Sequence, residues 1–374
     1  MTQYLSKFLT WSQKKEIPLT NLARPFRETA AFGKGIWRYW RSGRPEPESN
    51  CIVQKLFALT DGRSNDFLFH ILESKRRERS LELGWNTVSL VSDAGVSDPT
   101  IDAVVQTLKE DGVVVLPRKL KAETVQNLYQ MALACELNMT TWDSPRQSVT
   151  GAEIELSRVE HGSSHGIDLE KPRASVYAVP RRTLLKNPSL QSLLCDSYLL
   201  AIATRYLGVF PVVTKPDMWW DTAIWPEGLR PRPFHTDSGC LRWFKVGVNL
   251  TDTTLDTPHF VYVKGSHNPN RATRPLTRRL MSRMCLSDAE VMQVCGDRVV
   301  HLTAPAGSIT LADTRGLHKG ELGRVGHRLV LYLGMEGSAF NSIDHPIPVT
   351  NVVGELERAI RARPFGYQFF QRAA

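Results

Sequence analysis

Residues 234–250 read FHTDSGCLRWFKVGVNL, and they combine a short polar motif with a strand-like run. Phe244–Leu250 is mostly apolar and contains two valines, which is typical of a β-strand. Just before it, His235 and Asp237 are separated by one residue. In extended backbone, residues i and i+2 point to the same face, so both side chains can reach one ion. The stretch predicts a strand preceded by a candidate pair of metal ligands.

Similar short runs surround this stretch and predict an all-β sandwich or barrel in the C-terminal half. They are separated by Pro, Gly, Asp and Asn, the residues that favour turns. The strands predicted in this half are Val212–Thr214, Met218–Thr222, Phe244–Leu250, His259–Val263, Val299–Leu302, Ser308–Leu311 and 328–334, and an earlier short buried strand is predicted at 112–117. A basic insert, Asn268–Glu290, interrupts them and is predicted to be helical; its arginines are Arg271, Arg274, Arg278, Arg279 and Arg283.

The region before the strands is predicted to be helical. Apolar residues recur near the helical period in 51–59 and 66–75, so residues 1–97 are expected to be rich in helix. Three further helices are predicted at Pro99–Lys109, Ala122–Ala134 and Leu190–Leu207, the last ending at Gly208. The aromatic and basic run 36–41 suits packing anchors with extended Arg side chains, or contact with a membrane surface or an anion.

A second histidine strengthens the metal hypothesis. His318 lies in the segment Asp313-Thr-Arg-Gly-Leu-His-Lys-Gly320, directly after the strand Ser308–Leu311. Ten residues later, Arg328 opens the apolar run Leu329-Val-Leu-Tyr-Leu333. A buried guanidinium is costly without a partner, and a carboxylate would supply one. Arg324 is the other candidate cation, but its Gly-rich turn is typical of a solvated side chain.

Two imidazoles and one carboxylate on one face of a metal are the ligand set of non-haem Fe(II) oxygenases, and they leave three positions open. 2-Oxoglutarate would fill two of these positions and O2 the third. Arg328 would then bind the far carboxylate of 2-oxoglutarate. We therefore expect His235, Asp237 and His318 to hold Fe(II) and to act as the catalytic centre.

The chain also resembles the phytanoyl-CoA dioxygenase family over roughly residues 98–340. Glu110-Asp-Gly-Val-Val-Val-Leu-Pro117, the iron motif 235–237, Phe260-Val-Tyr-Val-Lys-Gly-Ser-His267 and the segment 317–328 carry this resemblance. It implies an α+β fold, with a double-stranded β-helix (jelly roll) oxygenase core and flanking helices at 98–374, after a helical region 1–97 of unknown role. It also implies that Asn249 faces the 2-oxoglutarate.

The expected reaction is hydroxylation of a C–H bond with conversion of 2-oxoglutarate to succinate and CO2. The same site could instead give desaturation, epimerisation or cyclisation. Halogenation is disfavoured because Asp237 occupies the position that a halide would need. A third hypothesis is a non-catalytic jelly roll that binds an anion through the basic insert.

Composition narrows the class of protein and its partners. The net charge is +9 and the pI near 9.3, which favours an anionic small-molecule substrate through long-range attraction. The sequence shows no nucleic-acid-binding motif and no apolar run long enough to span a membrane. It also lacks an apolar signal core, and its six cysteines form no CxxC pair, so a cytoplasmic location is expected. The sequence does not indicate an oligomeric state.

Other histidines, and the tryptophans near these motifs, are further candidates for metal ligands or pocket walls. His161 and His165 have the spacing of a helical metal pair, but the intervening Gly and Ser residues favour a loop. His267 is expected to be structural. Trp219, Trp220 and Trp243 are candidate walls of a substrate pocket. Because Trp219 and Trp220 are adjacent on a predicted strand, at most one of them can point inward.

Overall fold

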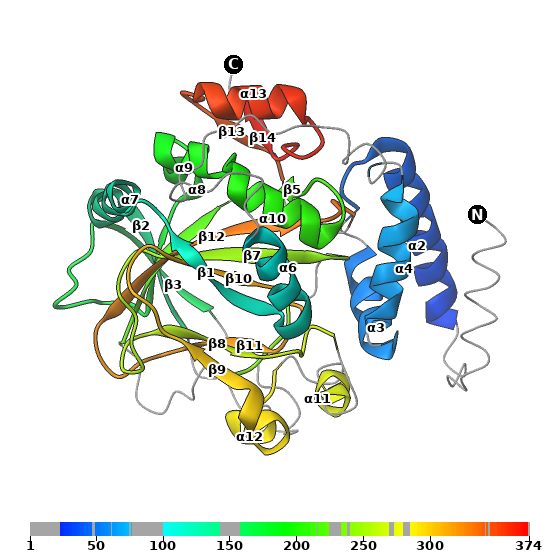
Figure 1. Ribbon diagram of the computed structural model, residues 1–374, viewed down its shortest axis with the longest axis horizontal. Coiled ribbons are helices and arrows are strands. Elements are labelled where there is room, and N and C mark those ends of the chain that lie inside the picture. The colour runs from blue at the N-terminus through cyan, green and yellow to red at the C-terminus, as the bar shows by residue number, and fades with distance from the viewer. Residues whose placement is uncertain are drawn as a thin grey trace.

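The computed structural model describes residues 23–46, 49–60, 62–74, 76, 100–142, 158–214, 216–223, 233–237, 240–268, 273–279, 285–340, 342 and 345–372. Figure 1 shows two groups of strands, one above the other, with helices around them. The larger group is a nine-stranded sheet in the order β1-β10-β7-β12-β6-β4-β2-β3, with β5 also paired to β12. The smaller sheet has the order β11-β8-β9. Neighbouring strands are antiparallel in both.

The described strands all lie from residue 113 onward. Their bounds are β1 Val113–Lys119, β2 Glu136–Trp142, β3 Arg158–His165, β4 Val176–Val179, β5 Val212–Val213, β6 Asp217–Thr222, β7 Trp243–Asn249, β8 His259–Val263, β9 Val299–Leu302, β10 Ser308–Ala312, β11 His318–Glu321 and β12 His327–Glu336. The last two strands, β13 Ile347–Val349 and β14 Phe370–Arg372, pair in parallel. All the strands predicted from the sequence are present.

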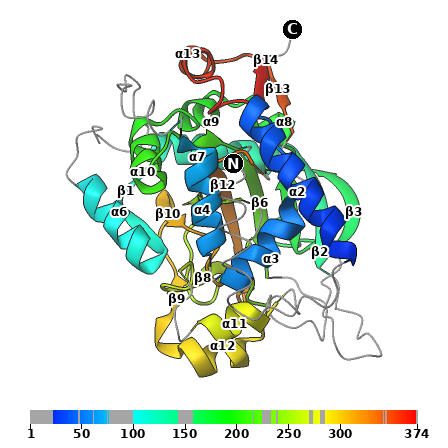
Figure 2. The ribbon, with the colours of Figure 1, turned by 90° about the vertical axis from the view of Figure 1, so that its right-hand side faces the viewer.

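Helices surround the two sheets. They are α2 Ala23–Ser42, α3 Asn50–Thr60, α4 Arg63–Leu72, α6 Thr100–Asp111, α7 Ala122–Ala134, α8 Arg181–Leu184, α9 Pro188–Leu193, α10 Ser197–Leu207, α11 Arg274–Arg279, α12 Asp288–Cys295 and α13 Gly354–Ala362. Figure 2 shows α3 and α4 in front of the strands, with α11 and α12 below them. No helix in the described part of the chain has the length and apolar character needed to cross a membrane.

The helix predicted at Leu190–Leu207 is in fact two helices, so that prediction was wrong. Asp196 interrupts it, because its carboxylate accepts hydrogen bonds from the N–H groups of Tyr198 and Leu199 and so caps α10. An N-cap residue has non-helical backbone, which separates α9 from α10. The predicted end is confirmed: Gly208 has a φ of 73°, a conformation in which a glycine can terminate a helix.

Strand β7 divides the interior into an apolar core and a polar side. Phe244, Val246 and Val248 are buried in the main hydrophobic core. Lys245, Gly247 and Asn249 alternate with them and therefore face the other side, toward the small sheet. The apolar residues of β12 follow the same rule, with Leu329, Leu331 and Leu333 in the main core. The two strands together leave a polar space between the sheets.

The N-terminal helices pack directly onto the strand-bearing part of the chain. Tyr39 of α2 is buried, and its hydroxyl accepts hydrogen bonds from Ser338 and Ala339 while it donates one to Glu73. Arg76 donates to the backbone oxygen of Phe210. The expected helical content of this region is confirmed for the described residues. The division of the chain at residues 97 and 98 stays a prediction.

Two parts of the sequence interpretation were incomplete. The strands β2, β3 and β4 form one end of the large sheet and were not predicted. The segment around His161 and His165 belongs to β3, so the loop expected there was wrong. In the aromatic run, Tyr39 is an internal anchor, whereas the Trp37 and Trp40 side chains are exposed.

Candidate metal centre

The backbone brings the two histidines of the site together. His235 and His318 form an isolated antiparallel bridge, in which each N–H donates to the other's carbonyl oxygen at 3.0 Å. The Asp237 N–H donates to the Thr314 oxygen at 2.8 Å. His318 begins β11, which pairs with β8. The segment 233–237 is thus joined by its backbone to the chain around His318.

The side chains of His235, Asp237 and His318 converge on one point. One ligand atom from each lies within 4.8 Å of the other two, and no other such group is found among the described residues. His318 Nε2 lies 3.6 Å from Asp237 Oδ2. The two imidazole ring centroids are 4.4 Å apart. These distances leave room for one ion between the three side chains.

Backbone contacts orient both imidazoles. The Nδ1 atom of His235 lies 3.2 Å from the Pro233 oxygen, and that of His318 lies 2.9 Å from the Gly316 oxygen. A carbonyl oxygen only accepts hydrogen bonds, so each Nδ1 carries a proton, and in the neutral ring Nε2 is the nitrogen with the lone pair. Hydrogen bonds of this kind commonly set the tautomer of metal-binding histidines.

The electrostatics of the site favour ligands without protons. Burial and the neighbouring His235 lower the pKa of the His318 imidazole to about 3, so this ring is neutral near pH 7. Burial alone would raise the pKa of Asp237, but Lys245 and the two imidazoles hold it well below its usual range. Asp237 is therefore a carboxylate. Its Oδ2 atom is buried and is the atom that faces the Lys245 ammonium.

Lys245 is a part of the site that the sequence interpretation missed. Its Nζ atom lies 2.7 Å from Asp237 Oδ2. Burial would lower the pKa of Lys245, but the Asp237 carboxylate raises it, so the ammonium is charged. The signal was present in the sequence, because Lys245, Gly247 and Asn249 alternate with apolar residues. A positive charge beside a metal ligand opposes cation binding and favours a bound anion.

A cavity lies between the two sheets, next to this cluster. It encloses about 370 Å³ of empty space, including its opening to solvent. Both sheets contribute walls, since β7, β10 and β12 belong to the large sheet and β8 and β9 to the small one. The lining residues are Lys245, Gly247, Asn249, Phe260, Leu302, Thr310, Ala312, Thr314, Arg328, Val330 and Tyr332.

Arg328 lines this cavity and is buried, as expected, but the chain itself supplies a carboxylate partner. One of its terminal nitrogens donates to Asp221 Oδ2 at 2.8 Å. The argument that a bound ligand is needed to balance this charge was therefore wrong. The Nε atom of Arg328 is buried and has no hydrogen-bond partner among the described residues. Part of the guanidinium remains available to a further acceptor.

Asn249 lines the same cavity, and Trp219 contacts one of its lining residues, whereas Trp220 and Trp243 are not among them. The Nδ2 atom of Asn249 lies 3.3 Å from Thr253 Oγ1. Trp219 stacks on the cavity residue Tyr332 with ring centroids 4.9 Å apart. Trp220 is buried in the main core on the opposite face of β6, so the predicted alternation is confirmed.

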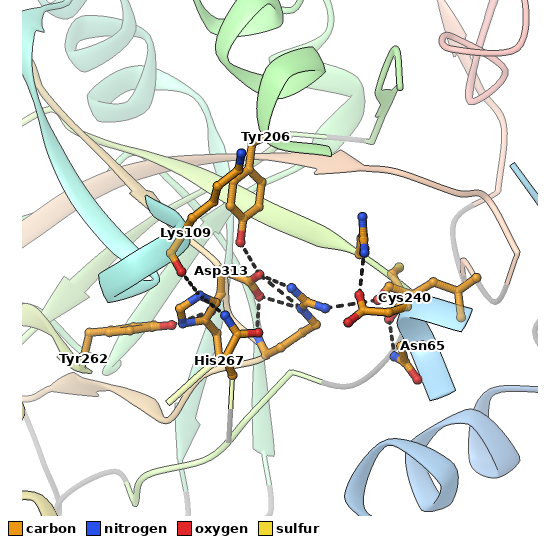
Figure 3. A network of polar contacts seen from close by, with 12 residues as sticks. Asn65, Lys109, Tyr206, Cys240, Tyr262, His267 and Asp313 are labelled. Carbon is orange, nitrogen blue, oxygen red and sulfur yellow. Dashed lines mark hydrogen bonds and ion pairs between the residues drawn. The ribbon is translucent and has the colours of Figure 1, made fainter. Parts of the chain in front are cut away.

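A buried polar network supports the loop that precedes His318 (Figure 3). Arg315 binds Asp313, and Tyr206 donates to the same carboxylate at 2.6 Å. Tyr262 donates to the Asp313 carbonyl oxygen at 2.7 Å. Burial would raise the pKa of Asp313, but Arg315 holds it below its usual range. The network is complete without a ligand, so it is structural support for the segment 313–318.

The remaining predicted residues lie outside this cluster. His165 is exposed on β3, and the side chain of His161 lies outside the described residues. His267 is buried, with Nε2 3.1 Å from the Lys109 oxygen, which agrees with a structural role. In the basic insert, Arg279 is exposed and pairs with Glu290 at 3.4 Å. Arg271 and Arg283, and the side chains of Arg274 and Arg278, lie outside the described residues.

Comparisons with known proteins give only remote similarity. No protein-family model matches the chain and no curated protein does, so the phytanoyl-CoA dioxygenase resemblance stays a prediction. Among solved structures, the non-heme alpha ketoglutarate dependent carbocyclase SnoK from nogalamycin biosynthesis is 18% identical, with a TM-score of 0.41. The match covers 67% of this chain and 87% of that chain.

Two other solved structures are similar to the same degree. EctD from S. alaskensis is 15% identical, with a TM-score of 0.42, and the match covers 68% of this chain and 83% of that one. The epimerase SnoN, in complex with Fe3+, alpha ketoglutarate and nogalamycin RO, is 17% identical with a TM-score of 0.42. That match covers 63% of this chain and 84% of SnoN. These similarities are weak, and the chemistry of the site follows from its own residues.

Proposed function

We propose that the protein is an Fe(II)- and 2-oxoglutarate-dependent dioxygenase that hydroxylates a C–H bond of a small, anionic metabolite. The observation that carries this proposal is the cluster of His235, Asp237 and His318 beside a cavity lined by a buried arginine. Two imidazoles and one carboxylate leave open positions on a metal, as an oxygenase requires.

The three side chains fit a divalent metal in their chemistry as well as in their spacing. Each imidazole turns Nδ1 toward a backbone oxygen, which leaves Nε2 for a metal, and Asp237 is a carboxylate whose buried Oδ2 atom faces the Lys245 ammonium. A metal ion would satisfy these three atoms together. When bound, Fe(II) with 2-oxoglutarate would supply the oxidising chemistry that protein side chains lack.

The cavity between the sheets fits the cosubstrate. Arg328 would bind the far carboxylate through Nε, which has no hydrogen-bond partner in the described part of the chain, while Asp221 holds another nitrogen of the guanidinium in place. Asn249 would offer its amide from β7. Arg328 itself is buried, which strengthens the charged hydrogen bonds that it makes.

The same arrangement supports the jelly-roll assignment. Two antiparallel sheets contribute to one cavity, and the candidate metal ligands lie at its edge. We therefore propose a double-stranded β-helix core within residues 98–374, of the phytanoyl-CoA dioxygenase type, with the helical region 1–97 packed beside it. The cytoplasmic location is part of this proposal.

The decisive experiment measures metal binding and turnover separately. Purified protein should bind close to one Fe(II) per chain and convert 2-oxoglutarate to succinate slowly without any substrate. His318→Ala should lose most of the iron, whereas His301→Ala, at an exposed histidine outside the cluster, should keep it. Full iron retention by His318→Ala would contradict the ligand assignment.

The same site could oxidise its substrate to different kinds of product. Hydroxylation is proposed, and desaturation, epimerisation and cyclisation use the same site. The product mass separates hydroxylation, which adds one oxygen atom, from desaturation and cyclisation, which each remove two hydrogen atoms, and from epimerisation, which leaves the mass unchanged. NMR of the product then separates desaturation from cyclisation. A protein that binds 2-oxoglutarate but never forms succinate would instead be the non-catalytic anion-binding jelly roll.

A further inference from the structure

A second cavity lies on the other side of Asp237, beneath the N-terminal helices. It encloses about 210 Å³ of empty space and is lined by Val53, Gln54 and Phe57 of α3, Asn65 of α4, and Asp237, Cys240 and Arg315. Sequence interpretation gave residues 1–97 no role. The cavity places two of their helices directly against a candidate metal ligand.

The two cavities meet at one ion pair. Asp237 lines the cavity beneath the helices, and Lys245 lines the cavity between the sheets. Their side chains are 2.7 Å apart. The candidate metal centre therefore separates a space within the sheets, proposed for 2-oxoglutarate, from a space under α3 and α4. A substrate must reach the metal from a side that the cosubstrate leaves open.

The position of α3 and α4 is fixed by specific contacts. Asn65 donates to the Cys240 oxygen at 3.3 Å (Figure 3), and Arg242 donates to Asp66 at 2.8 Å. Phe69 is fully buried in the main core. On the other side, α3 contacts α11 of the basic insert, and both views show these helices near each other (Figures 1 and 2). The helices form a fixed wall of the second cavity.

The walls of this cavity define the chemistry of its occupant. Val53 and Phe57 are apolar, while Gln54 and Asn65 offer amide groups. The Arg315 guanidinium is already neutralised by Asp313. The described lining therefore presents no uncompensated positive charge. Its empty space of about 210 Å³ includes the opening to solvent, so it takes only one end of a molecule.

We infer that α3 and α4 form the substrate-binding wall, and that the substrate presents an uncharged, partly apolar end to the metal centre between Phe57 and Asp237. An anionic group on the same molecule would then lie outside, toward α11. This inference rests on the proposed function and gives the N-terminal helices a direct role in choosing the substrate.

The test uses the protein alone, with Fe(II), 2-oxoglutarate and O2 as the only added reagents. Without a substrate, oxidation falls on the residues that line the substrate space. One oxygen atom of O2 is inserted into a C–H bond of Phe57, and the other enters succinate as CO2 leaves 2-oxoglutarate. Peptide mass spectrometry should find one added oxygen atom at Phe57, and Phe57→Leu should remove that signal from position 57.

Trp37 and Trp40 are internal controls, because both are exposed and indole is oxidised more readily than phenyl by diffusing radicals. Phe57 should be modified at least about tenfold faster than either tryptophan, and only when 2-oxoglutarate is present. Succinate formation without selective oxidation at Phe57 would overturn the inference while leaving the proposed function intact. Absence of succinate would overturn both.

Discussion

Asp221 is shared by two side chains, and this sharing determines what a substitution of Arg328 would report. Its Oδ2 atom accepts from Arg328 at 2.8 Å and from the Trp219 indole at 3.1 Å. Removing the arginine alone leaves a buried carboxylate without its cation, which costs about 3–5 kcal/mol of stability. Loss of cosubstrate binding in Arg328→Ala could then reflect a damaged fold.

A double substitution separates the two effects. Arg328→Met with Asp221→Asn removes both charges, so the free energy of unfolding should recover most of what Arg328→Ala loses. Affinity for 2-oxoglutarate should stay at least about 10²-fold below that of the wild type, because no cation remains for the far carboxylate. Calorimetric titration and urea unfolding measure these quantities. Arg324→Ala, at an exposed turn residue, should change neither.

A second prediction concerns the Lys245 ammonium beside Asp237. Its ammonium contacts the same Asp237 oxygen that a metal would use, so the metal must displace it or tolerate it. Lys245→Met should therefore tighten Fe(II) binding in the absence of 2-oxoglutarate by about tenfold, equivalent to about 1.4 kcal/mol. Anaerobic metal titration measures this. Lys264→Met is the matched control, because Lys264 pairs with Asp111 outside the cluster. Weaker binding in Lys245→Met would show that the lysine organises the site instead.

The start of β1 shows how one element depends on the buried network. Gly112 has a φ of 78°, in the left-handed region, and lies between α6 and β1. A Cβ atom there would collide with the His267 ring and the Tyr262 hydroxyl. The position needs glycine both for its backbone and for its contacts.

Gly112→Ala should accordingly lower the free energy of unfolding by about 1–3 kcal/mol or more. The matched control is Gly33→Ala within α2, where nothing lies within 4 Å of the added methyl group. That change should raise helix stability by up to about 1 kcal/mol. Urea unfolding of both variants gives the comparison. An equal change in the free energy of unfolding for both variants would show that the collision at Gly112 does not occur.

At the scale of elements, the sequence predicted strands such as β7 and β12 and missed β2, β3 and β4. β4 is apolar, but four residues are too few to tell a strand from a buried helix segment. β7 and β12 alternate clearly, because one face packs in the core. By contrast, β3 contains His161-Gly-Ser-Ser-His165 and has no such pattern. Its extended conformation comes from pairing with β2, and strand formation depends strongly on such neighbours. Lys245 was missed for another reason: the alternation of β7 assigns it to the polar face, but not to the neighbourhood of Asp237.

For the whole molecule, local patterns predicted the polar motifs but not how distant segments pack. His235, Asp237 and His318 were chosen by residue type and spacing, and the structure brings them together. The position of α3 and α4 over Asp237 depends on contacts such as that of Asn65 with Cys240, across 175 residues of sequence. No periodicity within residues 50–72 contains that information.

Acid stability is also a property of the whole molecule. Burial lowers the pKa of His318 to about 3, and burial also lowers the pKa values of His259, His267 and His327. The unfolded chain therefore binds more protons than the folded chain below pH of about 6.5, and stability rises with pH through this window. Each such histidine changes the free energy of unfolding by up to about 1.4 kcal/mol per pH unit in this window.

Metal-free protein should thus unfold at lower urea concentration at pH 5 than at pH 7. The part of this pH dependence that comes from His318 extends down to a pH of about 3, where its buried ring takes up a proton. His318→Gln should show a shallower dependence over the same range, because its side chain takes up no proton on unfolding. Parallel slopes for the two proteins would mean that His318 is not held neutral by burial.

The bridge between His235 and His318 is made by main-chain atoms alone, so it survives when a side chain is removed. Truncating an imidazole then leaves a vacancy of known shape in an otherwise assembled site. His235→Gly should accept free imidazole from solution as a replacement ligand, and millimolar imidazole should restore Fe(II) binding in a saturable way. Methylated imidazoles too large for the vacancy should fail. Here chemical complementation replaces a ligand that the chain no longer carries.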